Sequence, residues 1–364
     1  KSCSKCQGCE VSLKKIKLLY LLPDLSNAGP VNMCLSLIKG LDLNIYCVHV
    51  AALGDGELID EFKKYSEVIV YSRRQPVHFV RSIKKNNYDI IHSHTIIADL
   101  FSRMLPSGIR KITTIHNYPD VDSIYRRGKI IGGLLYYLQS KAIRLFFKVA
   151  CSDSVKRYCQ SQLKMDNIVA IPNGVPSSQL SLRPFKSDVT HFYYLGSLSR
   201  RKNVVELISG FTEWCLHKNA VLNLIGDGEL FNELSSNFAS NNVIFYGKIT
   251  HPEEIVINFD CFVSSSRAEG MPLALLEGLS LGKSYICSNI EPHSEVYQAD
   301  GGGAGVLYEL GNKKSLINAF EWYYSNQHKV LLSERARQCF DTHYDMKIMS
   351  QRYDILYKQK HQKY

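Results

Sequence analysis

The chain has 364 residues, of which 45% are hydrophobic and 21% are charged, the balance of a folded globular protein with room for two domains. It contains no apolar run long enough to span a membrane and no secretory signal pattern, so we expect a cytoplasmic protein. The formal net charge of +10 indicates anionic partners. Because no nucleic-acid-binding motif accompanies the charge, we expect phosphorylated substrates or acidic lipid and no nucleic acid.

Three of the eleven cysteines stand close together near the start, at Cys3, Cys6 and Cys9. Their CxxCxxC spacing suits a metal or cluster, but no fourth ligand lies nearby, and the alternative is a disordered leader over residues 1–14. The remaining cysteines lie mostly singly in apolar segments. There a reduced cysteine behaves as a small hydrophobic residue.

Apolar runs alternate with helical patterns from residue 16 onward. The run IKLLYLL (16–22) is followed by turn residues and by an apolar-periodic stretch, which predicts strand, turn and helix. The alternation continues through strands at 44–53, 67–72, 88–94 and 111–117, and through helices at 31–41, 56–65, 76–86 and 96–105. Apolar strands that alternate with helices predict a parallel sheet covered on both faces.

A basic segment follows, with no acid between Ser123 and Ser152. Its bases are Arg126, Arg127, Lys129, Lys141, Arg144 and Lys148. Apolar residues stand between them at helical spacing, which suits a helix lying on an anionic membrane surface. The alternative is a core helix with a basic, solvated face.

A second series of strands and helices begins near Thr190, after a stretch rich in Pro, Ser and Gly at 169–188 that we interpret as a linker. Its strands are predicted at 191–196, 220–226, 242–247, 261–266, 284–289 and 304–310. The sequence therefore predicts an α/β protein with two doubly wound, Rossmann-like domains, at 15–180 and 190–342. Their ligands should lie in a cleft at the loops that follow the strands.

The pentapeptide GDGEL occurs twice, at 54–58 and 226–230, each time after an apolar strand. Asp-Gly favours a turn, and an acid in the first turn of a helix is stabilised by the helix dipole. We therefore expect Glu57 and Glu229 to begin helices.

Three cations, Arg200, Arg201 and Lys202, stand between a predicted strand and a helix from Asn203. Cations beside a helix N-terminus favour a phosphate, although a solvated basic turn is the alternative. The segment EGMPL (269–273) also leads into a helix. The amides of Gly270, Met271 and Leu273 are therefore candidates for contact with a diphosphate.

Two glutamates flank that segment, at Glu269 and Glu277. Glu277 lies inside the predicted helix 273–281, where its carboxylate suits the vicinal hydroxyls of a ribose. Glu269 would then meet whatever lies beyond the phosphates. The two carboxylates are expected at opposite ends of one ligand.

Histidines close two of the apolar strands, at His92, His94 and His116. A structural histidine is the commoner case for any single one, and we place His116 first as a functional candidate, followed by His94. The pair Asp120 and Asp122 forms a DxD pattern. It follows Tyr-Pro in a predicted loop, and we interpret it as a turn and not as a metal site.

These segments, in this order, resemble the retaining glycosyltransferases of family 4, a GT-B group. The resemblance is carried by LGSLSRRKNVVELISGF, LNLIGDGEL, VIFYGKI and FVSSSRAEGMPLALLEGLSLGKSYICSNI with its E-x7-E spacing, and by SNAGPVNMCLSLIKGL, YDIIHSHT, ITTIHN and IPNGV in the first half. It implies metal-free transfer of a hexosyl or N-acetylhexosaminyl group from a nucleotide sugar, UDP-linked by preference. The implied acceptor is a glycan or lipid-linked glycan of cell-surface polysaccharide, handled at the inner membrane face.

The resemblance also implies roles for single residues. Lys202 and Arg201 would neutralise the diphosphate, Glu277 would hold the ribose, and Glu269 with the loop amides would fix the sugar. The implied catalytic residues are Glu269 and His116, and the implied donor-binding residues are Gly29, Arg201, Lys202, Gly270, Met271, Pro272, Leu273 and Glu277. Ser197 departs from the family pattern, which has Arg there; Arg200 or Arg201 would have to substitute.

The resemblance further implies that residues 343–364 form a helix that crosses back to the first domain. Two other functions stay open from the residues alone. One is a nucleotide-sugar epimerase of the same architecture, and the other is a nucleotide-sugar-binding subunit without catalysis, which Ser197 keeps in play.

Overall fold

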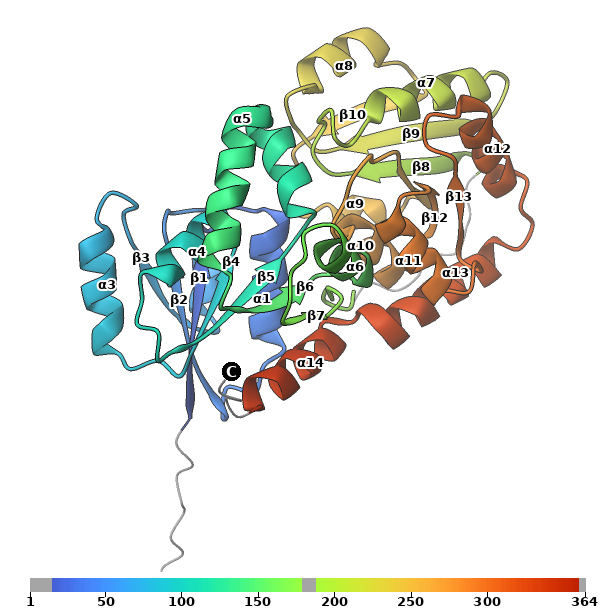
Figure 1. Cartoon of the computed structure of the whole chain (residues 1–364). Coiled ribbons are helices and arrows are strands. Elements are labelled where there is room, and N and C mark those ends of the chain that lie inside the picture. The colour runs from blue at the N-terminus through green and yellow to red at the C-terminus, as the bar shows by residue number, and fades with distance from the viewer. Residues whose placement is uncertain (1–14, 179–187, 360–364) are drawn as a thin grey trace, which may run out of the picture.

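The structure, a computed structural model, describes residues 15–178 and 188–359. The chain forms two α/β domains, blue to green and yellow to red in Figure 1, and each is built on one parallel sheet. This confirms the predicted pair of doubly wound domains. The leader at 1–14, with its three cysteines, lies outside the described residues.

The N-terminal domain contains a seven-stranded sheet. Its strands are β1 (Ile16–Leu22), β2 (Tyr46–Ala52), β3 (Glu67–Val70), β4 (Ile90–His94), β5 (Arg110–Ile115), β6 (Phe147–Ala150) and β7 (Ile168–Ala170). Its helices are α1 (Gly29–Lys39), α2 (Ile59–Lys63), α3 (Pro76–Lys85), α4 (Ile96–Arg103), α5 (Pro119–Ala142) and α6 (Asp153–Ser161). The strand order is β3-β2-β1-β4-β5-β6-β7, and all neighbours are parallel.

The C-terminal domain contains a six-stranded parallel sheet of order β10-β9-β8-β11-β12-β13. These strands are β8 (Thr190–Leu195), β9 (Ala220–Ile225), β10 (Val243–Gly247), β11 (Cys261–Ser264), β12 (Ser284–Ser288) and β13 (Gly305–Tyr308). The helices are α7 (Val204–Trp214), α8 (Phe231–Phe238), α9 (Glu253–Val256), α10 (Leu273–Ser280), α11 (Glu291–Ala299), α12 (Lys313–Tyr324) and α13 (Lys329–Cys339).

The strand order reverses at one point in each sheet, between β1 and β4 and between β8 and β11. Ligands of doubly wound sheets bind beyond the carboxyl ends of the strands at such points. Gly29 follows β1, His94 ends β4, Lys202 follows β8 and Glu269 follows β11. The topology therefore gathers the predicted site residues around the two reversal points.

The predicted linker at 169–188 begins too early. Val169 and Ala170 pair with Val149 and Ala150 of β6, and so belong to the edge strand β7. The strands β6 and β7 were not predicted because both are short, with four and three residues. In addition, β6 lies within the basic segment, which was interpreted as a helix.

The basic segment is not one straight helix. Gly128 has φ 76° and interrupts α5, and Gly132 packs so closely that an added Cβ would lie 2.4 Å from the Ser123 carbonyl oxygen. The helix is thus a hairpin whose two arms stand side by side in Figure 1. Its second arm is anchored by Gln139, whose Nε2 donates a 2.8 Å hydrogen bond to the buried carboxylate of Asp99.

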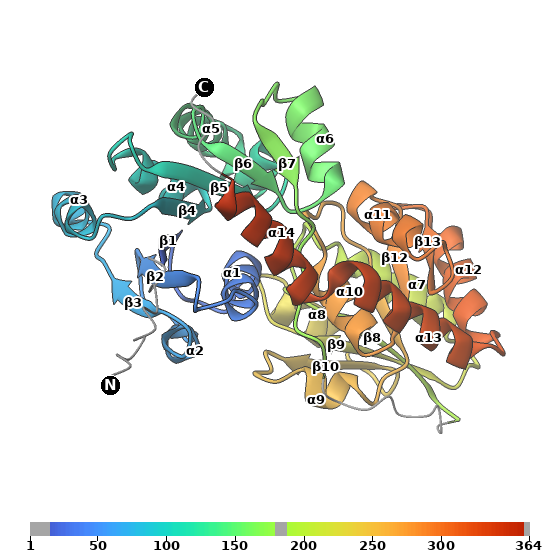
Figure 2. The same ribbon diagram turned by 90° about the horizontal axis from the view of Figure 1, so that it is seen from below.

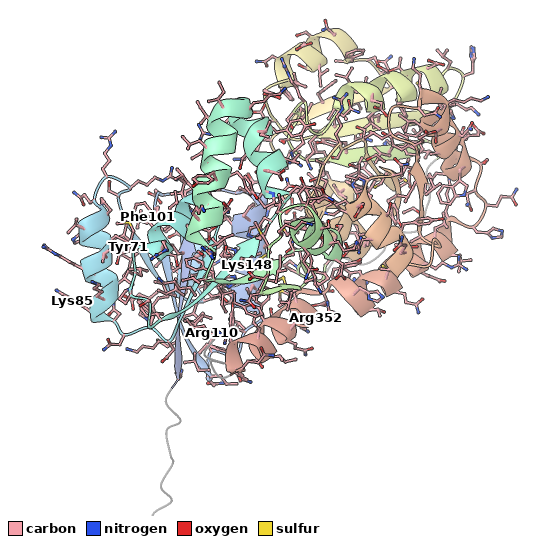
Figure 3. All side chains as sticks on the ribbon, viewed as in Figure 1. Tyr71, Lys85, Phe101, Arg110, Lys148 and Arg352 are labelled. Carbon is pink, nitrogen blue, oxygen red and sulfur yellow. The ribbon has the colours of Figure 1, made fainter. Side chains whose placement is uncertain are left out.

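Lys148 was expected on the basic face of this helix, and that expectation is wrong. It lies in β6 and is buried, with its Nζ donating to the backbone oxygens of Phe146 and Asp166 at 3.1 and 3.2 Å. Figure 3 shows Lys148 within the body of the molecule, whereas Lys85 projects from α3 at the edge. A lysine can be buried when backbone carbonyls replace its hydration.

The chain crosses between the domains twice. The second crossing runs through a π-helix, η1 (Phe340–Tyr344), into helix α14 (Met346–Lys358). The two crossings bond to each other, from Val175 N–H to the Tyr344 oxygen and from Met346 N–H to the Val175 oxygen. Figure 2 shows α14 reaching back to lie beside α1; residues 360–364 of the predicted helix lie outside the description.

One hydrophobic cluster contains residues of both domains. Ala150 and Val155 of the N-terminal domain belong to the same buried cluster as Met271 and Leu275 of the C-terminal domain. The domains are therefore packed together at the loop that carries Glu269.

Candidate functional site at the domain boundary

The loop between β11 and α10 holds Glu269 against two cations. The Glu269 carboxylate accepts a 3.0 Å hydrogen bond from Arg201 Nη1, a short one from Lys202 Nζ and a 2.7 Å bond from Ser266 Oγ. Arg201 also donates to the Ala268 oxygen of the same loop. The loops after β8 and β11 are thereby joined by one buried ion cluster.

Electrostatics keep Glu269 ionised. Its burial favours the neutral form, but the charges of Lys202 and Arg201 outweigh that effect and lower the pKa of Glu269 to about 2. The pKa of Arg201 is in turn raised: burial opposes this, and the Glu269 charge prevails. Two cations share one carboxylate, so the cluster carries one net positive charge that an anion can neutralise.

The start of α10 presents backbone donors beside this cluster. Within the part of the chain that the structure describes, the amides of Gly270, Met271 and Leu273 donate no hydrogen bond. Leu273 is the first residue of α10, and the first amides of a helix have no partner within it. The Met271 side chain is buried in the shared core, which leaves its amide as the group able to meet a ligand. Pro272 precedes the helix and has no N–H.

Glu277 lies on α10 in a different environment. Burial, with a smaller contribution from the charge of Glu253, raises the pKa of Glu277 to about 7. Among the described residues, none donates a hydrogen bond to its carboxylate. The Glu277 side chain is only partly buried, so the hydroxyl groups of a ligand can reach its unpaired carboxylate and donate to it.

The opposite domain meets this loop at close range. An added Cβ on Gly270 would lie 1.9 Å from the His116 carbonyl oxygen, so only glycine permits this approach. Ser152 Oγ donates a 2.8 Å hydrogen bond to the Gly270 oxygen. Gly29, the first residue of α1, faces Leu273, with 3.7 Å between the position of an added Cβ and Leu273 Cδ1.

The repeated GDGEL segments act differently from the expectation. Glu57 precedes α2 and does not begin it; its carboxylate accepts from the Asn27 amide at 3.1 Å and from Lys248 of the other domain at 2.9 Å. Glu229 precedes α8 and accepts from the Arg200 amide. Both glutamates fasten neighbouring loops, which a local turn pattern cannot reveal.

A row of three histidines leads from the N-terminal sheet to the boundary. His92 and His94 have ring centroids 4.4 Å apart, and His94 Nδ1 lies 2.9 Å from His116 Nε2. Burial lowers the pKa of His92 and of His116 to about 3, and it lowers the pKa of His94 as well. All three rings are therefore neutral at physiological pH.

The proton positions in this row follow from one unpaired atom. His94 Nε2 is buried without a hydrogen-bond partner, and an unpaired acceptor is tolerated better than an unpaired N–H. We therefore assign the proton of His94 to Nδ1, from which it is donated to His116 Nε2. His116 then carries its own proton on Nδ1 and can donate it to a ligand oxygen.

Helix α14, which packs against the N-terminal domain, contacts the His92 ring. Its Nδ1 is 2.7 Å from the Tyr357 hydroxyl on α14, and its Nε2 is 2.7 Å from Thr114 Oγ1. Both ring nitrogens of His92 therefore have partners within the protein, which fits its place below His116 and His94 in the prediction. The two groups on which it depends come from β5 and α14.

Two further expectations concern anion and metal sites. Arg201 reaches Glu269, whereas the Arg200 amide donates to Glu229; that one of the two arginines substitutes for the arginine missing at Ser197 stays a prediction. Asp120 and Asp122 lie in the first turn of α5 and not in an isolated turn, and they accept from Tyr158 and Asn117. The described residues contain no group of three side chains suited to a metal ion.

Sequence reasoning missed several partners of the site. Ser152 donates to the Gly270 oxygen, Ser266 donates to the Glu269 carboxylate, and Lys248 pairs with Glu57 across the domain boundary; none of these three contacts is predicted from the sequence. Ser152 and Lys248 reach their partners through tertiary packing, 118 and 191 positions away, whereas Ser266 lies three residues before Glu269.

The two parallel domains, with the site where they meet, define a GT-B fold. The chain belongs to the glycosyltransferases: the model of Glycosyltransferase Family 4 matches residues 28–179, and that of Glycosyl transferases group 1 matches residues 183–339. Together these confirm the glycosyltransferase family that the motifs indicate.

Curated relatives match along most of their length. The chain is 24% identical over 342 residues to UDP-Gal:alpha-D-GlcNAc-diphosphoundecaprenol alpha-1,3-galactosyltransferase of Escherichia coli, covering 85% of this chain and 87% of that protein. It is also 24% identical, over 305 residues, to the capsular polysaccharide biosynthesis glycosyltransferase CapH of Staphylococcus aureus, with 78% and 84% covered.

Solved structures share the fold. HepE of Anabaena in complex with UDP-glucose superimposes with a TM-score of 0.78 at 16% identity, over 94% of this chain and all of that one. A glycosyltransferase of Rickettsia africae gives 0.75 at 18% identity, over 95% and 98%. Among the described residues, no helix is long and apolar enough to cross a bilayer.

Proposed function

We propose that the protein transfers a hexosyl or N-acetylhexosaminyl group, with retention of configuration, from a UDP-sugar to a glycan or lipid-linked acceptor of cell-surface polysaccharide. The observation that carries this proposal is the cluster of Glu269 with Arg201 and Lys202, set against His116 across the domain boundary, with Glu277 unpaired on the next helix.

The donor would lie along α10. Its diphosphate would meet Lys202, Arg201 and the amides of Gly270, Met271 and Leu273, which together supply charge and hydrogen-bond donors. Such preset groups stabilise the negative charge that grows on the leaving diphosphate. Glu277 would accept from the ribose hydroxyls.

The transfer itself would use the leaving group as base. The bond between the anomeric carbon and the phosphate oxygen breaks, the acceptor hydroxyl oxygen bonds to the same face of the sugar, and its proton passes to the departing phosphate. Glu269 accepts three hydrogen bonds and is paired with cations, which makes it a positioning group for the sugar and a poor nucleophile. No metal is needed in this scheme.

The acceptor class is suggested by the relatives and by α5. The Escherichia coli relative is named for a diphosphoundecaprenol acceptor, and CapH for capsular polysaccharide. Large apolar side chains of α5 are exposed: Ile124, Tyr125, Ile130, Ile131, Leu134, Tyr137 and Leu138. Arg127, Lys129 and Lys141 are exposed among them, which suits an anionic bilayer surface at the inner membrane face.

A thermal-shift panel of UDP-, GDP- and ADP-sugars tests the donor, because a ligand bound to the folded state raises the melting temperature. We expect a UDP-sugar to give the largest shift and Glu277→Ala to reduce it. The same donor with octyl α-N-acetylglucosaminide should yield a product whose anomeric configuration, measured by NMR, equals that of the donor.

Three outcomes would contradict the proposal. A shift without transfer to any of a panel of octyl glycosides would favour a silent binding subunit. Conversion of the nucleotide sugar without an acceptor would favour an epimerase. An inverted product would exclude retention.

A further inference from the structure

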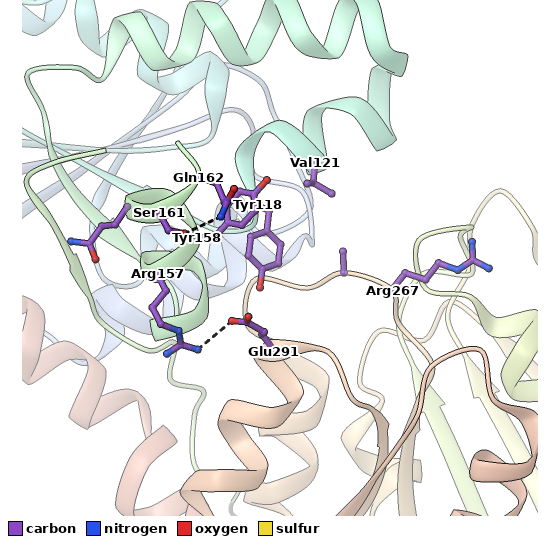
Figure 4. Close-up of a pocket in the computed structure, with 10 residues that line it drawn as sticks. Tyr118, Val121, Arg157, Tyr158, Ser161, Gln162, Arg267 and Glu291 are labelled. Atoms are coloured by element: carbon purple, nitrogen blue, oxygen red, sulfur yellow. Dashed lines mark hydrogen bonds and ion pairs between the residues drawn. The ribbon is translucent and has the colours of Figure 1, made fainter. Parts of the chain in front are cut away.

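A cavity of about 820 Å³ lies beside the ion cluster and is lined by both domains. Tyr118, the N-cap of α5, and Arg157 and Tyr158 of α6 line it from the N-terminal domain, while Ala268 and Glu291 line it from the C-terminal domain. Figure 4 shows Tyr118 and Arg157 facing Glu291 across the boundary. The volume is that of a pocket for a small organic ligand.

The lining combines aromatic rings with planar polar groups. Tyr118 and Tyr158 meet edge to face, with ring centroids 4.6 Å apart. Arg157 Nη2 donates to Glu291 Oε2 at 3.2 Å, and both side chains are more than half exposed, so the pair is weak and open to exchange. Tyrosine offers an apolar ring face and a polar tip, which suits a sugar ring, whose faces are apolar and whose rim carries hydroxyls.

The cavity adjoins the transfer centre. Ala268 precedes Glu269, and its carbonyl oxygen accepts from Arg201. Tyr118 stands two residues after His116. A ligand in the cavity would therefore lie on the acceptor side of the cluster, with the donor on the α10 side.

We propose that this cavity binds the terminal sugar of the acceptor glycan, with a pyranose ring against Tyr118 and Tyr158 and its hydroxyls on Arg157 and Glu291. This inference rests on the proposed function, whose acceptor it locates. Val121 also lines the cavity and belongs to α5, so a lipid carrier would leave along the exposed apolar side of that helix.

Because its walls come from two domains, the cavity exists as such only while the domains are closed. Acceptor binding and closure are then linked, since a ligand that binds one arrangement preferentially shifts the population toward it. The sugar should therefore bind more tightly to protein that already holds UDP.

Saturation-transfer NMR of methyl and octyl glycosides of glucose, galactose and N-acetylglucosamine, with UDP-loaded protein, tests the site. We expect ring-proton signals from at least one glycoside, and Tyr118→Ala and Ser161→Trp should weaken them at least fivefold. Ser161 lines the cavity, so Trp fills it without removing a contact of the tyrosines. Val330→Ala, a change at an exposed residue of α13 outside the cavity lining, should leave the signals unchanged.

Melting temperatures and the UDP-induced shift separate this inference from the proposed function. If both cavity variants fold and bind UDP but keep full glycoside signals, the acceptor lies elsewhere and the inference is wrong. Absence of signals from every glycoside with wild-type protein would overturn it too. If UDP does not raise the melting temperature of the wild-type protein, the donor assignment is refuted instead.

Discussion

Glu269 and Glu277 stand eight positions apart in opposite electrostatic environments. Two cations lower the pKa of Glu269 to about 2, whereas burial raises the pKa of Glu277 to about 7. At neutral pH the first is a fixed anion and the second exchanges a proton. Ligand hydroxyls donate best to an ionised carboxylate. The donor should therefore bind preferentially to protein in which Glu277 is ionised.

The pH dependence of donor affinity checks this. Binding of UDP-glucose, whose diphosphate diester keeps its charge, should be roughly tenfold weaker at pH 6 than at pH 8, because the free protein holds a proton on Glu277 below pH 7. Isothermal titration calorimetry measures the affinity at each pH. Glu277→Gln should bind weakly with a flat profile, and an equally steep profile in that variant would contradict the assignment.

The His94 ring should act by fixing the proton of His116. His94→Phe removes the donor to His116 Nε2 and should lower kcat about tenfold, the effect of one lost hydrogen bond in the transition state. His94→Asn, whose amide can occupy the place of Nδ1–H, should restore part of it. The KM for the donor should stay within twofold in both variants, and equal losses in the Phe and Asn variants would refute the positioning role.

At the scale of elements, the exposed apolar residues of α5 predict binding to membranes. Replacing Ile130 and Ile131, both more than half exposed, by Ser should reduce binding to vesicles with anionic lipid at least about tenfold, because each isoleucine loses apolar burial in the interface. Vesicle co-sedimentation measures the bound fraction. Replacing Val330 and Leu331, two exposed apolar residues of α13, by Ser is the matched control.

Charge separates bilayer docking from simple hydrophobic adsorption. Binding should fall when anionic lipid is replaced by zwitterionic lipid, since each basic residue near the surface contributes about 1 kcal/mol. Wild-type protein that binds both vesicle types equally, or neither, would contradict the membrane proposal.

The elements show how far the sequence alone can reach. The central strand β1 is predicted because both of its faces are buried, which makes it a continuous apolar run. The bend of α5 at Gly128 was not predicted, because a single glycine in a helical pattern does not by itself indicate a positive φ. The pairing of Glu269 with Lys202 joins residues 67 positions apart, so local patterns could nominate both groups but not their contact.

For the whole molecule, the approach of Gly270 to His116 predicts a control of domain closure. Gly270→Ala would place a Cβ 1.9 Å from the His116 oxygen, so the domains cannot close as observed. We expect a larger radius of gyration in small-angle X-ray scattering and a transfer rate at least about tenfold lower, as overpacking costs about 1–3 kcal/mol. Gly133→Ala has open space around it and should change neither quantity; an unchanged radius in Gly270→Ala would contradict the closed state.

The two chain crossings, bonded side by side through Val175, Tyr344 and Met346, limit how such opening can occur. Two domains joined by a single segment can rotate about that segment. Two hydrogen-bonded segments resist such a rotation. The domains would then open most easily by separating on the side away from the crossings. The contact between Lys248 and Glu57 would be among those that this opening breaks. Each turnover would return the two halves of the donor site to the same register, because the ribbon preserves their alignment while the substrates exchange.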